Sequence, residues 1–123
     1  MFSMKRSKIV TKSMIKDNDV YELLLKIPAG KLSTYGDLAK ALGKPSASRA
    51  IGRILAKNPN PIVVPCHRVV MSDGKLGGYA YGITRKRELL EKEGISFTDK
   101  IISNFNEVRV YPLVSKTAVR ISD

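Results

Sequence analysis

One short stretch of the sequence holds both residues that could carry out nucleophilic chemistry. It spans residues 58–70 (NPNPIVVPCHRVV) and contains the only cysteine and the only histidine of the 123 residues, Cys66 and His67. A cysteine becomes a nucleophile when positive charge or a paired base favours its thiolate. Because His67 and Arg68 directly follow Cys66, this stretch is a candidate nucleophilic site.

A structural role for Cys66 is an open alternative. An unpaired cysteine commonly serves as a small buried hydrophobe. Neighbouring residues of an extended chain point to opposite sides, so the adjacency of Cys66 and His67 does not establish a contact between them.

The residues just before Cys66 predict a rigid support for it. Two X-Pro turns at residues 58–61 end the preceding helix. The β-branched run Ile62–Val64 favours a short buried strand. Pro65 cannot donate to a strand ladder, so we expect Cys66 to begin a bend where this strand ends.

Two helices joined by a tight turn are predicted before the cysteine. The first begins at Ser33–Asp37, where Thr34 and Asp37 have capping-box spacing, and ends at Gly43. The second is capped by Ser46 and runs to about Lys57. One face of this second helix is apolar and the other is basic and small, with Ala50, Ile51, Ile54 and Leu55 on the first and Arg49, Gly52, Arg53 and Ala56 on the second. This pattern is typical of a helix-turn-helix, although helical hairpins with basic outer faces are common in other proteins.

Further helices are expected on both sides of this unit. Residues 17–19 can cap a helix that continues to Ile27 and ends at Pro28. After the cysteine, residues 72–75 form a turn and residues 77–82 form a glycine-rich loop, either a mobile loop able to lie against a planar ligand or a plain connection. A helix over residues 84–93 then ends at Gly94.

Residues 58–70 resemble the active-site signature of the O6-alkylguanine-DNA alkyltransferases, the methylated-DNA–protein-cysteine methyltransferases. These proteins transfer an alkyl group from damaged guanine to their own cysteine. The resemblance runs from about Val20 to Gly94 and includes, at the family's separations, Tyr35, Ser48-Arg49-Ala50, Gly77-Gly78-Tyr79 and Glu93-Gly94. It implies a single-use DNA repair enzyme that needs no cofactor.

The resemblance also implies catalytic roles for individual residues. Cys66 would take the alkyl group, His67 would activate it through a water molecule, and Glu93 would orient His67. Asn58 would brace the turn, and the Tyr35 hydroxyl would donate a proton to the departing guanine. Without the resemblance, a solvated carboxylate at Glu93 and core packing at Tyr35 are the simpler interpretations.

DNA contacts are implied by the same resemblance. The target nucleotide would be flipped out of the duplex, with Arg49 entering the stack in its place. The second helix of the helix-turn-helix would lie in the minor groove. The implied DNA-binding residues are Arg49, Tyr35, Ala47, Ser48, Gly52 and Arg53. The implied base pocket consists of Tyr35, the Val69 carbonyl, Tyr79 and Ala80.

Composition agrees with a nucleic-acid partner and limits other classes of function. The 22 Lys and Arg residues against 11 Asp and Glu give a formal net charge of +11, which favours a polyanionic partner. No apolar run approaches the ~20 residues that span a bilayer, so we expect no membrane partner. One cysteine and one histidine cannot form a Cys/His zinc site, so we expect no metal. A single cysteine also fits the reducing cytoplasm, where we expect the protein to act.

The predicted fold is α+β and mainly helical, a winged-helix-like helix-turn-helix domain with a short strand carrying the nucleophilic Cys66. The predicted organisation is a basic N-terminal arm (1–16), an alkyltransferase domain (17–100) and a C-terminal extension of unknown role (101–123). In the extension Val108 and Val110, then Val119 and Ile121, alternate with polar residues, so a strand pair or a partly ordered segment is expected there. The expected partner is double-stranded DNA containing O6-alkylguanine, bound by a monomer.

Three other functions fit parts of the sequence. An alkyltransferase-like protein would bind alkylated DNA and recruit other repair factors, but such proteins typically lack the nucleophile that Cys66 provides. A thiol hydrolase could use Cys66, His67 and a carboxylate, but it would also need an oxyanion hole. Such an enzyme has no use for a helix with a groove-facing arginine. A helix-turn-helix regulator would need no reactive thiol.

Overall fold

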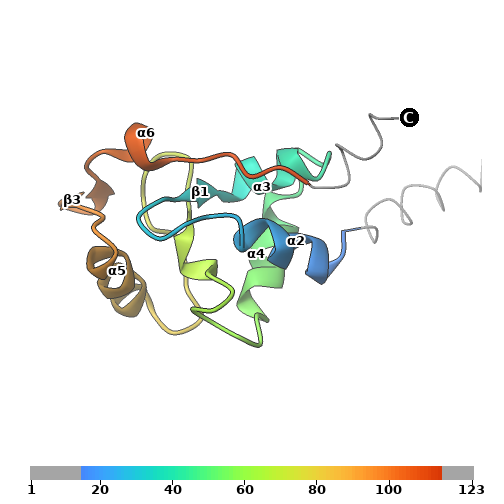
Figure 1. Cartoon of the computed structure of the whole chain (residues 1–123), viewed down its shortest axis with the longest axis horizontal. Helices are drawn as coiled ribbons and strands as arrows, with labels where there is room; N and C mark the ends of the chain where they lie inside the picture. Colours follow the sequence, from blue (N-terminus) through green and yellow to red (C-terminus); the bar gives the residue numbers. More distant parts are fainter. Residues whose placement is uncertain (1–14, 115–123) are drawn as a thin grey trace, which may run out of the picture.

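Helices dominate the computed structural model, which describes residues 15–114 (Figure 1). The helices are α2 (Asp17–Leu24), α3 (Tyr35–Ala41), α4 (Ser48–Ala56), α5 (Ile83–Lys92) and α6 (Phe105–Val108), with a 3₁₀ turn η1 (Cys66–Arg68). The strands are β1 (Ser33–Thr34), β2 (Val69–Val70), β3 (Phe97–Thr98) and β4 (Ile101–Ile102). The prediction of a mainly helical α+β fold is confirmed. No helix within residues 15–114 has the length and apolar character needed to cross a membrane.

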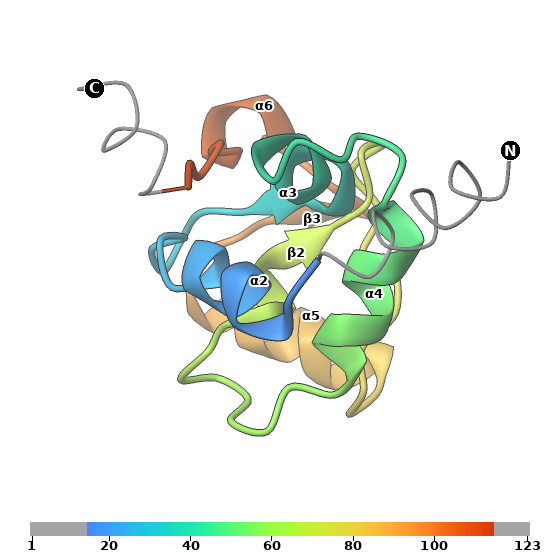
Figure 2. The same ribbon diagram turned by 90° about the vertical axis from the view of Figure 1, so that its right-hand side faces the viewer.

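A parallel pair of two-residue strands connects the segment before α3 to the segment after Cys66. β1 leads directly into α3, and β2 directly follows η1, with Ser33 paired to Val69 and Thr34 to Val70. α2, α4 and α5 surround β2 (Figure 2). The pair therefore holds the start of α3 and the turn at Cys66 in a fixed register.

Two clusters of buried apolar residues stabilise this arrangement. The larger joins α2, α3 and α4 to Cys66 and Val69. The smaller cluster joins β2 and α5 to the segment after α5 and consists of Leu32, Val70, Leu76, Leu90, Ile95, Ile102 and Val108. Burial of these side chains is the main favourable contribution to folding.

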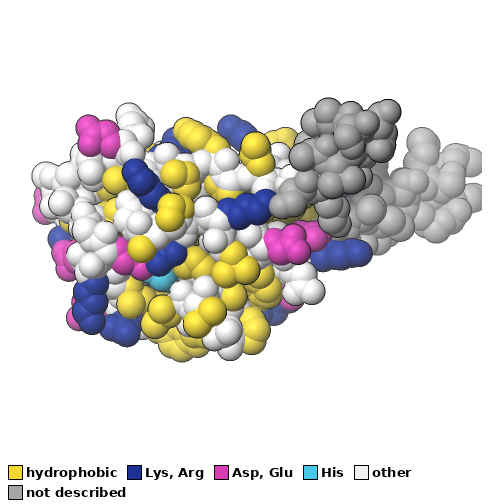
Figure 3. Space-filling model, viewed as in Figure 1, with side chains coloured by type: hydrophobic (Ala, Val, Ile, Leu, Met, Phe, Trp, Pro, Cys, Tyr) yellow, Lys and Arg dark blue, Asp and Glu magenta, His cyan; other side chains and the backbone are white. Residues whose placement is uncertain are grey.

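The predicted strand at Ile62–Val64 is wrong. Ile62 has a φ of +75° and is 49% exposed, and Val63 is 65% exposed. Figure 3 shows hydrophobic side chains on the lower part of the molecule, where Figure 1 places this loop. Hydrogen bonds turn the segment back on itself: the Val64 N–H donates to the Asn60 carbonyl (2.9 Å), and the Asn58 amide donates to the Val64 carbonyl (2.8 Å). Cys66 therefore begins a 3₁₀ turn, and the strand, β2, comes after it.

The predicted helical pair before the cysteine is present, with two changes at helix starts. Thr34 caps α3 as expected, because its hydroxyl accepts a hydrogen bond from the Asp37 N–H (3.0 Å). α4 begins at Ser48 and has no side-chain cap, because the Ala47 N–H donates to the Lys44 carbonyl and places Ser46 in a turn. α2 ends at Leu24 instead of Ile27, and Asp17 lies in its first turn instead of capping it.

The faces of α4 agree with the prediction. Ile51, Ile54 and Leu55 are buried, whereas Arg49 and Arg53 are exposed. α3 and α4 pack against each other, joined by the turn at residues 42–47. Two packed helices with a short turn are the arrangement that a helix-turn-helix requires.

The segment after α5 folds back onto the domain. β3 and β4 form an antiparallel hairpin, and Ile102 and Val108 enter the smaller core cluster. Val108 and Val110 lie on either side of Arg109, which forms a parallel bridge with Leu32. Most of the predicted N-terminal arm, together with Val119 and Ile121, lies outside the described residues.

Candidate active site

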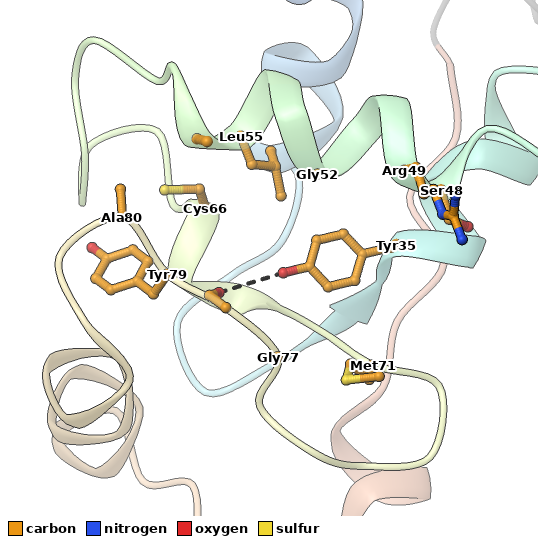
Figure 4. A pocket seen from close by; sticks show the side chains of 12 residues that line it. Tyr35, Ser48, Arg49, Gly52, Leu55, Cys66, Met71, Gly77, Tyr79 and Ala80 are labelled. Carbon is orange, nitrogen blue, oxygen red and sulfur yellow. Dashed lines mark hydrogen bonds between the residues drawn. The ribbon is translucent and has the colours of Figure 1, made fainter.

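Cys66 lies in the wall of a cavity of about 550 Å³ (Figure 4). Residues from four segments line it: Tyr35, Ser48, Arg49, Gly52, Leu55, Ala56, Cys66, Met71, Gly77, Gly78, Tyr79 and Ala80. In Figure 4 the Tyr35 ring points across the cavity from the side opposite Cys66, with α4 above. The volume is within the range of small-molecule sites.

The cavity brings together most of the residues predicted for the base pocket and several of those predicted for DNA. Tyr35, Tyr79 and Ala80 line it, as do Arg49, Ser48 and Gly52 of α4. The predicted residues outside its lining are His67, Glu93, Asn58, Val69, Ala47 and Arg53. Ala47 packs partly against the core, and Arg53 is exposed on α4.

Behind the cysteine, His67 is fully buried and hydrogen-bonded to Glu93. Its Nε2 lies 2.9 Å from Glu93 Oε2. Burial lowers the pKa of His67 below its ordinary value of 6.5, although the bond to Glu93 opposes this. His67 is therefore neutral near pH 7, with Nε2 donating to Glu93. Its Nδ1 is buried and has no hydrogen-bond partner within residues 15–114, so its lone pair is available to accept a proton.

Arg68 completes this group and was not predicted as a site residue. Its Nε and Nη2 donate to the two oxygens of Glu93 at 3.0 and 2.7 Å, and its Nη1 donates to the Ile27 carbonyl at 2.7 Å. Burial alone would raise the pKa of Glu93, but the hydrogen bonds from Arg68 and His67 outweigh it and lower that pKa. Glu93 is thus a fixed carboxylate that orients His67.

Asn58 braces the loop that leads to the cysteine. Its amide nitrogen donates to the Val64 carbonyl, and its amide oxygen accepts from the Asn60 N–H at 2.9 Å. The Cys66 N–H in turn donates to the Val64 carbonyl at 2.8 Å. The Val64 carbonyl therefore links Asn58 to the backbone of the cysteine.

Lys86 is a buried cation that the sequence analysis missed. Its Nζ donates to the carbonyls of Val69 (2.7 Å), Leu76 (2.6 Å) and Gly78 (3.0 Å). Burial lowers its pKa to about 8. Because it is three and four residues before the buried Leu89 and Leu90 on α5, helical spacing could have placed it on the inner face. Through these bonds Lys86 holds the loop at residues 76–78 to Val69, the first residue of β2.

Tyr35 is held against this loop. Its hydroxyl donates to the Gly78 carbonyl at 3.5 Å, and its ring centroid is 5.8 Å from Lys86 Nζ. Burial and the nearby Cys66 raise the pKa of Tyr35, so the phenol stays protonated and can donate a proton. Gly77 has a φ of +72°, and a Cβ there would lie 3.1 Å from Met71 Cγ and 3.4 Å from the Tyr35 ring. The loop approaches Tyr35 closely because this position has no side chain.

A match over most of the chain shows its family. Residues 16–95 match the family model described as 6-O-methylguanine DNA methyltransferase, DNA binding domain. The chain belongs to this family. The matched residues of this 6-O-methylguanine DNA methyltransferase family member include Cys66 in the cavity wall. The segment after residue 95 lies beyond the match.

Individual relatives agree with this assignment. A methylated-DNA–protein-cysteine methyltransferase of Mycobacterium bovis is 51% identical over 74 residues, which cover 60% of this chain and 45% of the relative. The crystal structure of Mycobacterium tuberculosis OGT in complex with DNA superposes with a TM-score of 0.61 at 49% identity, covering 63% of this chain and 48% of that one. S. pombe Atl1 in complex with damaged DNA containing O6-carboxymethylguanine gives a TM-score of 0.66 at 33% identity, covering 78% and 94%. The chain spans less than half the length of the curated relatives it matches.

Proposed function

We propose that this protein repairs DNA by transferring the alkyl group of O6-alkylguanine, or of O4-alkylthymine, in duplex DNA irreversibly to its own Cys66. The observation that carries the proposal is the placement of the only cysteine in a cavity that Tyr35 and Arg49 also line. In the transfer, the bond between O6 and the alkyl carbon breaks and a bond from Cys66 Sγ to that carbon forms. The product is a thioether, which has no carbonyl carbon that water could attack. The thiol is therefore not regenerated, and each chain acts once.

Proton movements in this reaction involve side chains on two sides of the cysteine. The thiol proton passes through a water molecule to His67 Nδ1, and the fixed carboxylate of Glu93 stabilises the resulting imidazolium. Tyr35 donates its phenolic proton to the guanine so that the base does not leave as an anion. Asn58 braces the loop before Cys66, and the Tyr79–Ala80 segment holds one edge of the base. The Val69 carbonyl lies outside the cavity lining and accepts a hydrogen bond from Lys86, so only its second lone pair would be left for the base.

Access to the base requires flipping, for which α4 is the proposed DNA-binding helix. Its exposed face carries Arg49 and Arg53 beside Gly52, where an added Cβ would meet no atom of residues 15–114 within 4 Å. Together with Ala47 and Ser48, this face can approach the minor groove closely, and Arg49 fills the place of the extruded base. The protein would act as a monomer in the cytoplasm, attracted to duplex DNA by its net charge of +11.

Mass spectrometry tests the proposal directly. The protein is incubated with an excess of duplex containing O6-methylguanine, and we expect a gain of one methyl group per chain, located on Cys66. Cys66→Ala and an unmethylated duplex are the controls, and both should give no gain. We expect Cys66→Ala to bind duplex within several-fold of the unmodified protein, because the contacts of α4 drive base extrusion. No methyl gain by the unmodified protein would refute the proposal.

The alternative function, that of an alkyltransferase-like protein that binds alkylated DNA and recruits other repair factors, is not favoured, because such proteins typically lack the nucleophile that Cys66 provides. The same experiment separates the two functions. A protein that prefers methylated duplex but gains no mass would have this second function.

A further inference from the structure

The segment beyond the family match makes a buried ion pair with α3. Arg109 Nε and Nη2 donate to the two oxygens of Asp37 at 2.9 and 2.8 Å, and the Asp37 side chain is 3% exposed. The Arg109 guanidinium lies 5.3 Å from the ring centroid of Phe105 and 5.1 Å from that of Tyr111. A bidentate pair held between two rings has a fixed orientation, unlike a surface ion pair.

The same segment is also joined to the backbone just before α3. The Leu32 N–H donates to the Val108 carbonyl at 2.9 Å, and the Val110 N–H donates to the Leu32 carbonyl at 2.7 Å. Leu32 directly precedes β1, whose pair with β2 is described above. Residues 108–110 therefore extend the sheet at this point.

Tyr35 lies between these two attachment points. Leu32 is three residues before it, and Asp37 is two residues after it, in the first turn of α3. The Asp37 N–H also donates to the Thr34 cap, so the carboxylate and the backbone of Asp37 both hold the start of the helix. Residues 108–110 thus fix the chain on both sides of Tyr35.

We propose that Arg109 is a positioning residue for Tyr35, and that residues 108–110, outside the matched family domain, are part of the catalytic unit. The inference rests on the proposed function, in which the Tyr35 hydroxyl donates a proton to the guanine. Within the part of the chain that the structure describes, the Tyr35 hydroxyl has one long hydrogen bond, 3.5 Å to the Gly78 carbonyl. Its aim therefore depends on the backbone that carries it, and a small displacement of a proton donor slows a reaction strongly.

A double-mutant cycle tests this coupling. Arg109→Gln removes the charge but keeps most of the side chain that packs on the two rings. We expect it to slow methyl transfer to Cys66 by about tenfold, and to have almost no further effect in the Tyr35→Phe background, because both changes remove the same proton donation. The loss of melting temperature should be equal in the two backgrounds. Equal slowing in both backgrounds, or no slowing in either, would overturn the inference.

Two further variants guard against a general loss of structure. Arg87→Gln is the matched control, since Arg87 also pairs with a carboxylate (Glu91, 3.1 Å) and stacks on a ring (Phe97, 4.5 Å) but does not line the cysteine cavity. Transfer by Arg87→Gln should match the unmodified protein. Arg109→Lys keeps the charge without the bidentate geometry and should restore part of the rate; if Arg109→Gln does not fold, the cycle is measured with Arg109→Lys.

A spectroscopic readout separates this inference from the proposed function. The chain has five tyrosines, and Tyr35→Phe identifies the signal of Tyr35 in a spectrum of ring-labelled protein. Arg109→Gln should shift or broaden that signal, and Arg87→Gln should not. An unchanged Tyr35 signal would overturn the inference even in a protein that transfers methyl groups. A shifted signal in a protein that gains no methyl group would refute the proposed function alone.

Discussion

His67 and Lys86 are both 0% exposed, but they are accommodated in different ways. His67 is neutral near pH 7 and shares a carboxylate with Arg68, so no uncompensated charge is buried there. Lys86 donates to three backbone carbonyls, so its ammonium exchanges water for fixed partners. His67 therefore has the neutral form that its proposed role as a base requires, and Lys86 supplies a rigid support for the cavity loop.

Titration of His67 should be visible in acid stability. Because its folded-state pKa is below 6.5, the unfolded chain takes up the proton first as the pH falls, and stability decreases from about pH 6.5 toward the folded-state pKa. Glu93, with a pKa lowered from 4.5, adds a further loss below that value. Since His67 is the only histidine, the melting temperature of His67→Asn should depend less on pH between 6.5 and 4.5 than that of the unmodified protein. A melting temperature that is already flat there in the unmodified protein would contradict the lowered pKa.

The same pKa predicts the pH dependence of the reaction. The rate of methyl transfer should stay level as the pH is lowered through 6.5 and fall only at lower pH, where His67 becomes protonated. Single-turnover rates across this range provide the measurement. A fall centred at or above 6.5 would show that His67 is not the base in this environment.

Replacing Lys86 should loosen the cavity. Lys86→Met fills similar space but leaves three carbonyls without their donor, which we expect to cost ~1–3 kcal/mol in the free energy of unfolding. Transfer should slow because residues 76–78 and Tyr35 lose their common support. Lys92→Met on the exposed side of the same helix is the control and should change melting temperature and rate little. Equal effects of the two substitutions would contradict a special role for Lys86.

Two elements form opposite sides of the cavity and contribute in different ways. The loop at residues 76–80 carries backbone groups and has a glycine at its closest approach to Tyr35. α4 carries exposed side chains on a helix whose other face is buried. The loop should therefore be sensitive to added volume, and α4 to loss of charge.

Neighbouring glycines of the loop allow a matched test. Gly77→Ala places a Cβ 3.1 Å from Met71 Cγ at a φ of +72°, whereas Gly78→Ala meets no atom of the described residues within 4 Å. We expect Gly77→Ala to lower stability by more than about 1 kcal/mol and to slow transfer, because Tyr35 is displaced. Gly78→Ala should keep its melting temperature. The melting temperatures of the two variants provide the test. Similar values would show that the loop accommodates a Cβ at either position.

On α4, the role proposed for Arg49 separates flipping from chemistry. Arg49→Ala should slow repair of duplex DNA on the order of tenfold or more, since unstacking and unpairing a base costs a few kcal/mol. Reaction with free O6-benzylguanine, which needs no flipping, should be nearly unchanged, provided that this base enters the cavity. Arg53→Ala is the control on the same exposed face outside the cavity. Equal slowing with both substrates would place Arg49 in the chemical step.

For the whole molecule, net charge governs the encounter with DNA. The formal charge of +11 is spread over a small chain, and a duplex neutralised by several Lys and Arg residues releases bound counterions. Its affinity for duplex should therefore fall steeply as salt rises, on the order of 10³-fold between 50 and 200 mM if about six phosphates are contacted. Binding measured across that range, with Cys66→Ala to prevent reaction, provides the test. A flat salt response would remove backbone contacts as the source of affinity.

The sequence by itself determined the features that depend on neighbours within a turn or two. The Thr34 cap, the buried face of α4 and the turn at residues 72–75 follow from such local rules. Residue types alone made the stretch around Cys66 a candidate site, and its resemblance to a family signature gave that site a predicted chemistry. The strand expected at Ile62–Val64 does not form, because a strand needs a partner strand, whereas Val64 forms hydrogen bonds with Asn58 and Asn60, which are near it in sequence. Only the tertiary structure decided which distant groups meet: Lys86 with Val69, 17 residues apart, and Arg109 with Asp37, 72 residues apart. Those contacts have no local signature, because they form when the packed core brings buried charges to the partners that compensate for lost water.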